Sequence, residues 1–161
     1  NADKIKELNN EMLEIIRYAA YKYKQSEKLE EMALKLKICV DDFNDITSTS
    51  TLANYYRSIE NYLEMEKYYL RGIYNNCSTC ALNYGIYFYS IKNYEEMMRC
   101  YDIAIKHENK NAYFQLYLYY KDIEDETQIS KYYNLIIENK ELMDKYYEID
   151  TINNILFRKQ T

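Results

Sequence analysis

Proline is absent from the chain of 161 residues, and glycine occurs only as Gly72 and Gly85. A fold with many sharp turns needs both residue types, because proline presets turn geometry and glycine adopts backbone angles that other residues avoid. Their scarcity favours long helices joined by short polar links. Neither glycine belongs to a glycine-rich phosphate-binding loop, so the sequence carries no nucleotide-binding motif of that kind.

Basic residues are also fewer than acidic ones: the chain has 21 Lys and Arg residues and 26 Asp and Glu residues, and its net charge is -5 at pH 7. Binding to nucleic acid irrespective of sequence needs a basic surplus, so we do not expect a nucleic-acid partner. No run approaches the roughly 20 apolar residues of a membrane span, and no signal-peptide pattern is present. We therefore expect no membrane association. Hydrophobic residues make up 48% of the chain, which suffices for one domain with a core.

Cysteine is too sparse for a disulfide scaffold, which favours a reducing, cytoplasmic location. Cys77 and Cys80 form a CxxC motif, whose spacing allows two sulfurs to bind one metal ion. A closed zinc site needs two further ligands, and the remaining ligand types are Cys39, Cys100 and the single histidine, His107. We interpret the motif as structural and predict no metal and no cofactor. A metal or redox module using this CxxC pair is kept as an alternative function.

An internal repeat runs through the chain. The segment Ser58–Tyr62 recurs 32 residues later as Ser90–Tyr94, with four of five residues unchanged. An offset shared by many positions is the signature of stacked supersecondary units. The same offset relates further apolar positions: Met65 and Met97, Tyr69 and Tyr101, Ile73 and Ile105, Phe88 and Tyr120, and Tyr101 and Tyr133.

The clearest unit consists of Ala81, Tyr84, Gly85 and Phe88, followed by Met97, Tyr101 and Ala104. This spacing resembles the tetratricopeptide pattern Trp-x2-Leu-Gly-x2-Tyr followed by Ala-x3-Phe. Over about residues 13–138 the chain is similar to tetratricopeptide and Sel1-like repeats. It lacks their terminal proline. The resemblance implies an all-α fold, a right-handed α-solenoid superhelix of antiparallel helix pairs in which neighbouring pairs share a core.

We expect one repeat domain over residues 1–161, with Asn1 and Ala2 interpreted as a cloning remnant. The predicted units are about 13–44, 46–77, 78–109 and 110–138, followed by C-terminal capping helices at about 139–160. A polar loop is predicted at 41–51, and Gly85 and Ala53 are expected to let helix backbones approach closely. Helices are predicted at about 3–24, 27–40, 51–59, 62–74, 79–91, 94–107, 111–122, 127–138, 140–149 and 151–159.

The resemblance also implies a concave groove lined by the first helix of each pair, which binds a peptide or helix of a partner. We therefore predict a protein–protein interaction scaffold or adaptor that is not an enzyme, and we also expect self-association through the solenoid ends. The predicted groove residues are Arg17, Tyr21, Lys24, Asn54, Arg57, Asn83, Ile86, Tyr89, Phe114, Leu118 and Lys121.

One subtype of the family holds a C-terminal carboxylate with two asparagines and several basic residues. Asn54 and Asn83 match the two asparagines, but Ser50, Asn111 and Gln115 stand where that subtype has basic residues. We therefore do not predict binding of a carboxylate tail.

A helical-repeat RNA binder is the third hypothesis, because such proteins read about one base per repeat with side chains of a helix. Arg17, Lys24, Arg57 and Lys121 would then form a local basic stripe. The net charge argues against this alternative.

Overall fold

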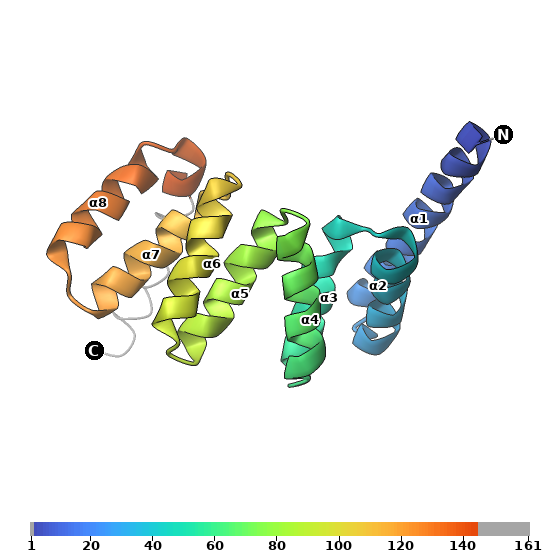
Figure 1. Cartoon of the computed structure of the whole chain (residues 1–161), viewed down its shortest axis with the longest axis horizontal. Helices are drawn as coiled ribbons and strands as arrows, with labels where there is room; N and C mark the ends of the chain where they lie inside the picture. Colours follow the sequence, from blue (N-terminus) through green and yellow to red (C-terminus); the bar gives the residue numbers. More distant parts are fainter. Residues whose placement is uncertain (1, 145–161) are drawn as a thin grey trace. The chain divides into compact units, whose positions relative to one another are not determined.

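The computed structural model describes residues 2–144, and every regular element in this range is an α-helix (Figure 1). The predicted all-α fold class is therefore confirmed. The capping helices predicted at about 139–160 lie largely outside the described residues, although a helical segment begins at residue 140. The helices are α1 (Ala2–Gln25), α2 (Leu29–Phe43), α3 (Ile46–Ser58), α4 (Tyr62–Tyr74), α5 (Ser78–Ser90), α6 (Tyr94–Lys106), α7 (Asn111–Asp122) and α8 (Glu126–Ile137).

Two compact units make up the chain, Asn1–Tyr84 and Gly85–Thr161, and their boundary falls within α5. In the first unit α1 packs on α2, α2 on α3, and α3 on α4; in the second, α6 packs on α7 and α7 on α8. The links between these helices are two to four residues long, so each packed pair runs antiparallel. The predicted repeat boundaries stay a prediction. Within residues 2–144, no helix is both long and apolar enough to span a membrane.

The chain turns without glycine by placing one residue of each link in the left-handed backbone region. The N–H of the next residue then closes the turn: Asn61 donates to the carbonyl of Tyr56 and Asn93 to that of Phe88, both at 2.9 Å. This bond pattern is the Schellman motif that ends many helices. It explains how a chain with two glycines forms so many links. From Asn44 onward the left-handed residues recur every 16 positions: Asn44, Glu60, Asn76, Lys92, Glu108 and Glu124.

In several of these turns the residue after the left-handed position caps the next helix with its side chain. The side chains of Asn61, Asn93 and Asp125 accept hydrogen bonds from backbone N–H groups three residues later, at 3.1 to 3.3 Å. These bonds satisfy donors that a helix N-terminus otherwise leaves unpaired. Left-handed residue and cap together form a turn unit that repeats along the chain.

The loop predicted at 41–51 is wrong. Only Asn44 and Asp45 separate α2 from α3. The Ser/Thr run suggested a loop because hydroxyl groups compete for backbone hydrogen bonds. Here the hydroxyls bond inside the helix instead: Ser48 donates to the Asp45 carboxylate at 2.5 Å, and Thr49 donates to the Asp45 carbonyl at 3.1 Å. Both residues are buried, so the run forms the first turn of α3.

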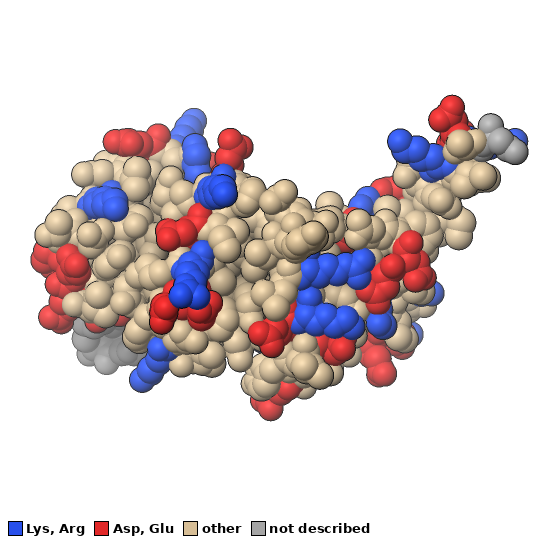
Figure 2. Space-filling view, in the orientation of Figure 1, with Lys and Arg blue, Asp and Glu red and all other residues tan. Residues whose placement is uncertain are grey.

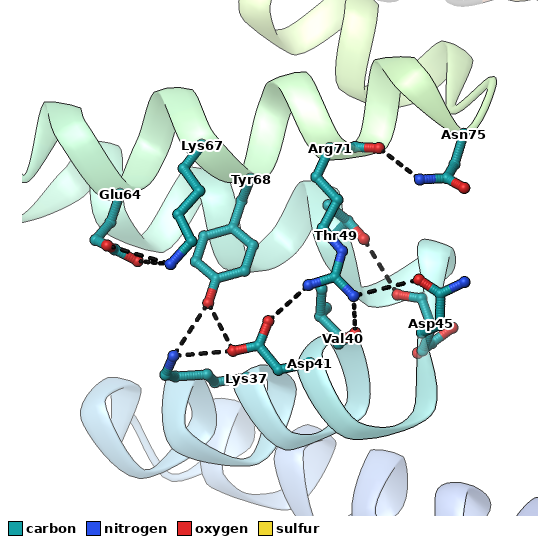
Figure 3. Close-up of polar contacts among 11 residues, drawn as sticks. Lys37, Val40, Asp41, Asp45, Thr49, Glu64, Lys67, Tyr68, Arg71 and Asn75 are labelled. Atoms are coloured by element: carbon teal, nitrogen blue, oxygen red, sulfur yellow. Dashed lines mark hydrogen bonds and ion pairs between the residues drawn. The ribbon is translucent and has the colours of Figure 1, made fainter.

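A polar network fastens α4 to α2 in the first unit (Figure 3). The carboxylate of Asp41 accepts hydrogen bonds from Lys37 at 2.9 Å, from the Tyr68 hydroxyl at 3.0 Å and from Arg71 at 2.7 Å. Arg71 also donates to the carbonyl of Val40 at 2.5 Å. Burial acts to raise the pKa of Asp41, but the hydrogen bonds from Lys37 and Tyr68 lower it overall. The network therefore fixes one helix pair on the next.

Gly85 lies at a close contact with α6, where the nearest atoms belong to Tyr101 and to Cβ of Cys100. A Cβ atom at this position would lie 2.5 Å and 2.7 Å from two ring carbons of Tyr101. Tyr101 is 1% exposed, so its ring has no room to move aside. The glycine is needed to admit this buried ring.

Gly85→Ala is expected to lower the free energy of unfolding by about 1–2 kcal/mol, because overpacking costs more than the gain in helix propensity. Urea denaturation followed by circular dichroism measures the change. Ser130→Ala, an exposed change in α8 of the same unit, is the control. An alanine variant as stable as the wild type would show that the Tyr101 ring moves aside at no cost in stability.

Candidate peptide-binding groove

Two depressions of the first unit hold five of the predicted groove residues. The smaller, of about 200 Å³, is lined by Arg17, Tyr21 and Lys24 of α1 together with residues of α2 and α3. The larger, of about 550 Å³, lies between α3 and the start of α5 and contains Asn54 and Asn83. Thr47 and Thr51 line both depressions, so we treat the two as one groove. The larger one is lined by Ile46, Thr47, Ser50, Thr51, Asn54, Asn76, Cys77, Ser78, Thr79 and Asn83.

Asp45 fixes the wall between α1 and α3. Its carboxylate accepts hydrogen bonds from Arg17 at 3.0 Å and 2.5 Å, and it caps α3 through the backbone N–H of Thr47 at 3.1 Å. The side chain of Asp45 is only 2% exposed, whereas that of Arg17 is 33% exposed. Arg17 therefore lines the groove as predicted, but its charge is already engaged within the fold.

The Asp45 carboxyl is held in its charged form. Burial acts to raise its pKa, but hydrogen bonds from Arg17, Ser48 and Thr47 outweigh burial and lower the pKa to about 2, from an ordinary value of 3.8. The fold therefore stabilises the charged form of the Asp45 side chain relative to its protonated form.

Because the folded pKa lies below the unfolded value, this stabilisation is present above about pH 4 and is lost as the pH falls towards about 2. The loss is expected to reach about 2 kcal/mol in the free energy of unfolding. Urea denaturation between these pH values, on the wild type and on Asp45→Asn, isolates the contribution. If the difference between the two proteins does not change with pH, Asp45 does not titrate as described.

Asn54 and Asn83 face the larger depression with complementary free groups. The Tyr69 hydroxyl donates to Oδ1 of Asn54 at 2.5 Å, which leaves the Asn54 amide N–H groups available. Nδ2 of Asn83 donates to the Ser50 hydroxyl at 2.8 Å, which leaves its carbonyl oxygen available. No other side-chain hydrogen bond of Asn54 or Asn83 occurs within residues 2–144. The groove therefore presents one donor and one acceptor, each oriented by a neighbour.

The donor side of this pair is held rigidly. Tyr69 is fully buried and its ring stacks on Tyr84 with 5.0 Å between ring centroids. Burial raises the pKa of Tyr69 to about 12, so the hydroxyl keeps its proton and remains a donor to Asn54. Arg57, the sixth predicted residue of this unit, is half-buried and lines neither depression.

The remaining predicted residues belong to the second unit, and two of them are partly core. Phe114 and Leu118 pack against a buried cluster that includes Ile136. The Tyr89 hydroxyl donates to the carboxylate of Asp122, and this bond raises the pKa of Tyr89 to about 12. Of the others, Ile86 is half-buried and Lys121 is exposed.

The basic stripe predicted for an RNA binder is weakened by the ion pairs of Arg17. Its guanidinium group contacts the carboxylates of Glu14 and Asp45, both at 2.5 Å. On the face drawn in Figure 2, acidic side chains lie beside many of the basic ones. These observations add no support to RNA binding.

Sequence reasoning missed the hydroxyl residues of the groove, chiefly Thr47, Thr51, Ser78 and Thr79. The predicted loop at 41–51 contains the first two, and the CxxC motif encloses the other two. The available signal was the aspartate at position 45, since aspartate is one of the residues preferred at a helix N-cap.

The two cysteines of the CxxC motif differ in exposure. Cys77 is half-buried and lines the larger depression, whereas Cys80 is fully buried. Within the described part of the chain, no group of three or more His, Cys, Asp or Glu residues is placed to hold a metal ion.

Neither a protein-family model nor a curated protein sequence matches the chain. Solved structures do match the chain. The crystal structure of MamA matches with a TM-score of 0.66 and 17% identity, covering 89% of this chain and 87% of that one. BtubC (BKLC) from P. vanneervenii matches with a TM-score of 0.64 and 12% identity, covering 86% and 66%. Both are tetratricopeptide-like helical-repeat proteins. This chain shares their fold. At such identities the likeness shows the fold alone.

Proposed function

We propose that the chain is a protein-interaction scaffold whose groove binds an extended peptide segment of a partner protein. The donor and acceptor that Asn54 and Asn83 present in the larger depression carry this proposal. Every peptide unit offers one carbonyl acceptor and one N–H donor. An extended segment in the depression pairs its carbonyl with the Asn54 amide and an N–H with the Asn83 oxygen.

The lining of the groove determines which segments fit. The larger depression contains no Lys, Arg, His, Asp or Glu residue, so it favours main-chain and small polar groups over charged side chains. Lys24 is exposed at the smaller depression and supplies a positive charge near one end. The partner segment is therefore uncharged where it crosses α3, with an acidic residue accommodated towards α1.

The fold supports a binding role. Stacked helix pairs provide extended surfaces on which proteins of this architecture hold their partners. That support is an analogy of fold, whereas the oriented amides are a property of this chain.

Selection from a displayed library of random peptides tests the proposal. Immobilised wild type, Asn54→Ala/Asn83→Ala and Asn134→Ala are compared, with reducing agent present throughout so that thiol chemistry plays no part. Asn134 is an exposed residue of α8 in the second unit and serves as the matched control. Peptides enriched on the wild type are expected to bind Asn134→Ala equally and to lose affinity for the double variant.

Two outcomes would overturn the proposal. One is a wild-type selection that enriches no peptide. The other is a set of enriched peptides that bind the double variant as tightly as the wild type, since those peptides would use another surface. Circular dichroism of all three proteins ensures that the comparison is made between folded chains.

A further inference from the structure

Cys77 occupies the helix-capping slot of its turn. It directly precedes α5 and follows the left-handed Asn76, and its Sγ accepts the backbone N–H of Cys80 at 3.2 Å. Other turns fill this slot with Asn or Asp, as at Asn61 and Asp125. A sulfur at a helix N-terminus is stabilised as the thiolate by the free N–H groups and the helix dipole.

Cys80 places a second sulfur next to the first. It lies one turn into α5, fully buried, and both cysteines pack against Gly72 of α4. A Cβ atom at Gly72 would overlap the sulfur of Cys80 and would lie 3.4 Å from Cβ of Cys77. Gly72 therefore leaves free the space that the sulfur of Cys80 fills beside Cys77.

The environment gives the two thiols opposite character. A hydrogen bond from the Cys80 thiol outweighs burial and lowers the pKa of Cys77 below its ordinary value. The same hydrogen bond, together with burial, raises the pKa of Cys80. Cys39 and Cys100 are buried as well, and burial raises the pKa of Cys100 to about 12.

We propose that Cys77 and Cys80 form a thiol–disulfide exchange site for small-molecule disulfides, in which Cys77 attacks and Cys80 resolves. The Cys77 thiolate attacks one sulfur of the disulfide, forming a mixed disulfide and releasing one thiolate, which takes up a proton. Cys80 then loses its proton and attacks the Cys77 sulfur. The Cys77–Cys80 disulfide forms and the second small thiol leaves. Two protein thiols are oxidised and one small disulfide is reduced to two thiols.

Access favours Cys77 as the attacking residue. Among the four cysteines it is the one that is not buried, and it lines the larger depression beside Ser78 and Thr79. A disulfide entering the depression meets this sulfur first, while Cys80 stays shielded until the mixed disulfide has formed. The site needs no bound peptide, and it lies in the same depression as the proposed peptide contacts of Asn54 and Asn83.

Reaction of the full chain with glutathione disulfide, followed by acid quenching and mass spectrometry, tests the site. Tryptic cleavage after Arg71 and Lys92 yields a peptide that contains Cys77 and Cys80 and neither of the other cysteines. In the wild type this peptide is expected to be lighter by two hydrogen atoms, because Cys77 and Cys80 form a disulfide. In Cys80→Ser it is expected to carry one glutathione on Cys77, and in Cys77→Ser it is expected to do neither.

Rates supply the second readout. At neutral pH Cys77 is expected to react about tenfold faster than Cys100, because a thiolate in reach of solvent is the nucleophile. Cys77→Ser keeps a capping oxygen and therefore the fold, and Cys100→Ser is the matched control, expected to react as the wild type does. Circular dichroism verifies that each variant is folded. Equal rates at Cys77 and Cys100, or a wild-type peptide that keeps both thiols in excess glutathione disulfide, would overturn the proposal.

Discussion

Asp45→Ala is expected to lower the free energy of unfolding by about 3 kcal/mol, because it removes a buried carboxylate that is both a helix cap and an ion-pair partner. The substitution removes the N-cap of α3, which by itself is worth about 1 kcal/mol. It also leaves the guanidinium of Arg17 and the buried hydroxyl of Ser48 without their shared partner, and unpaired buried groups are costly. Urea denaturation at neutral pH measures the loss.

Two companion variants separate the causes. Asp102→Ala removes the same charge from an exposed position of α6 and is expected to change stability little. Asp45→Asn keeps a capping oxygen but loses the ion pair, so its stability should fall between wild type and Asp45→Ala. A cost for Asp45→Ala no greater than that of Asp102→Ala would show that the wall between α1 and α3 does not depend on this carboxylate.

Asn54→Asp is expected to weaken peptide binding by about 30-fold, because it turns the donor of the groove into an acceptor facing a peptide carbonyl. Tyr69 continues to donate to the other carboxylate oxygen, so the fold is retained. Asn83→Asp introduces the same charge but keeps an acceptor in place. Because the Ser50 hydroxyl can reverse its hydrogen bond, affinity should then stay within about threefold of the wild type. Fluorescence polarisation of a selected peptide gives both affinities.

The pair of variants forms its own control, since charge and size change equally in both. Equal losses at the two positions would mean that the peptide senses added negative charge and not the direction of hydrogen bonding. In that case the assignment of Asn54 as donor and Asn83 as acceptor would be wrong.

The helix pairs were predictable because their signals are local and repeated. Apolar residues at helical spacing and asparagines such as Asn61 and Asn93 before the second helices mark where helices begin. The predicted ranges 62–74 and 111–122 coincide with α4 and α7. The Schellman turns were not predictable from composition, since residues such as Glu60 and Lys92 adopt the left-handed conformation without any glycine.

Side-chain partners were the part that the sequence could not supply. The Ser/Thr run at positions 47–51 reads as a loop until Asp45 is known to cap it and to bind Arg17. Likewise Gly85 signals a close contact, but only the structure shows that a buried ring of Tyr101 makes it.

The candidate site was therefore predicted in outline only. Asn54 and Asn83 were placed on the groove face by resemblance, and both line the larger depression. Their free groups depend on Tyr69 and Ser50, which lie 15 and 33 residues away in the chain. Long-range pairings of this kind leave no pattern in a single sequence.

The most direct test is a nuclear magnetic resonance titration of the 15N-labelled chain with a library-selected peptide, following the side-chain amides of asparagine. The account predicts that the side-chain amide resonances of Asn54 and Asn83 shift in proportion to the bound fraction, together with the backbone amides of Thr47 and Thr51. The resonance of Asn134 should not move. Saturable binding that leaves Asn54 and Asn83 unchanged, with all shifts elsewhere, would contradict it.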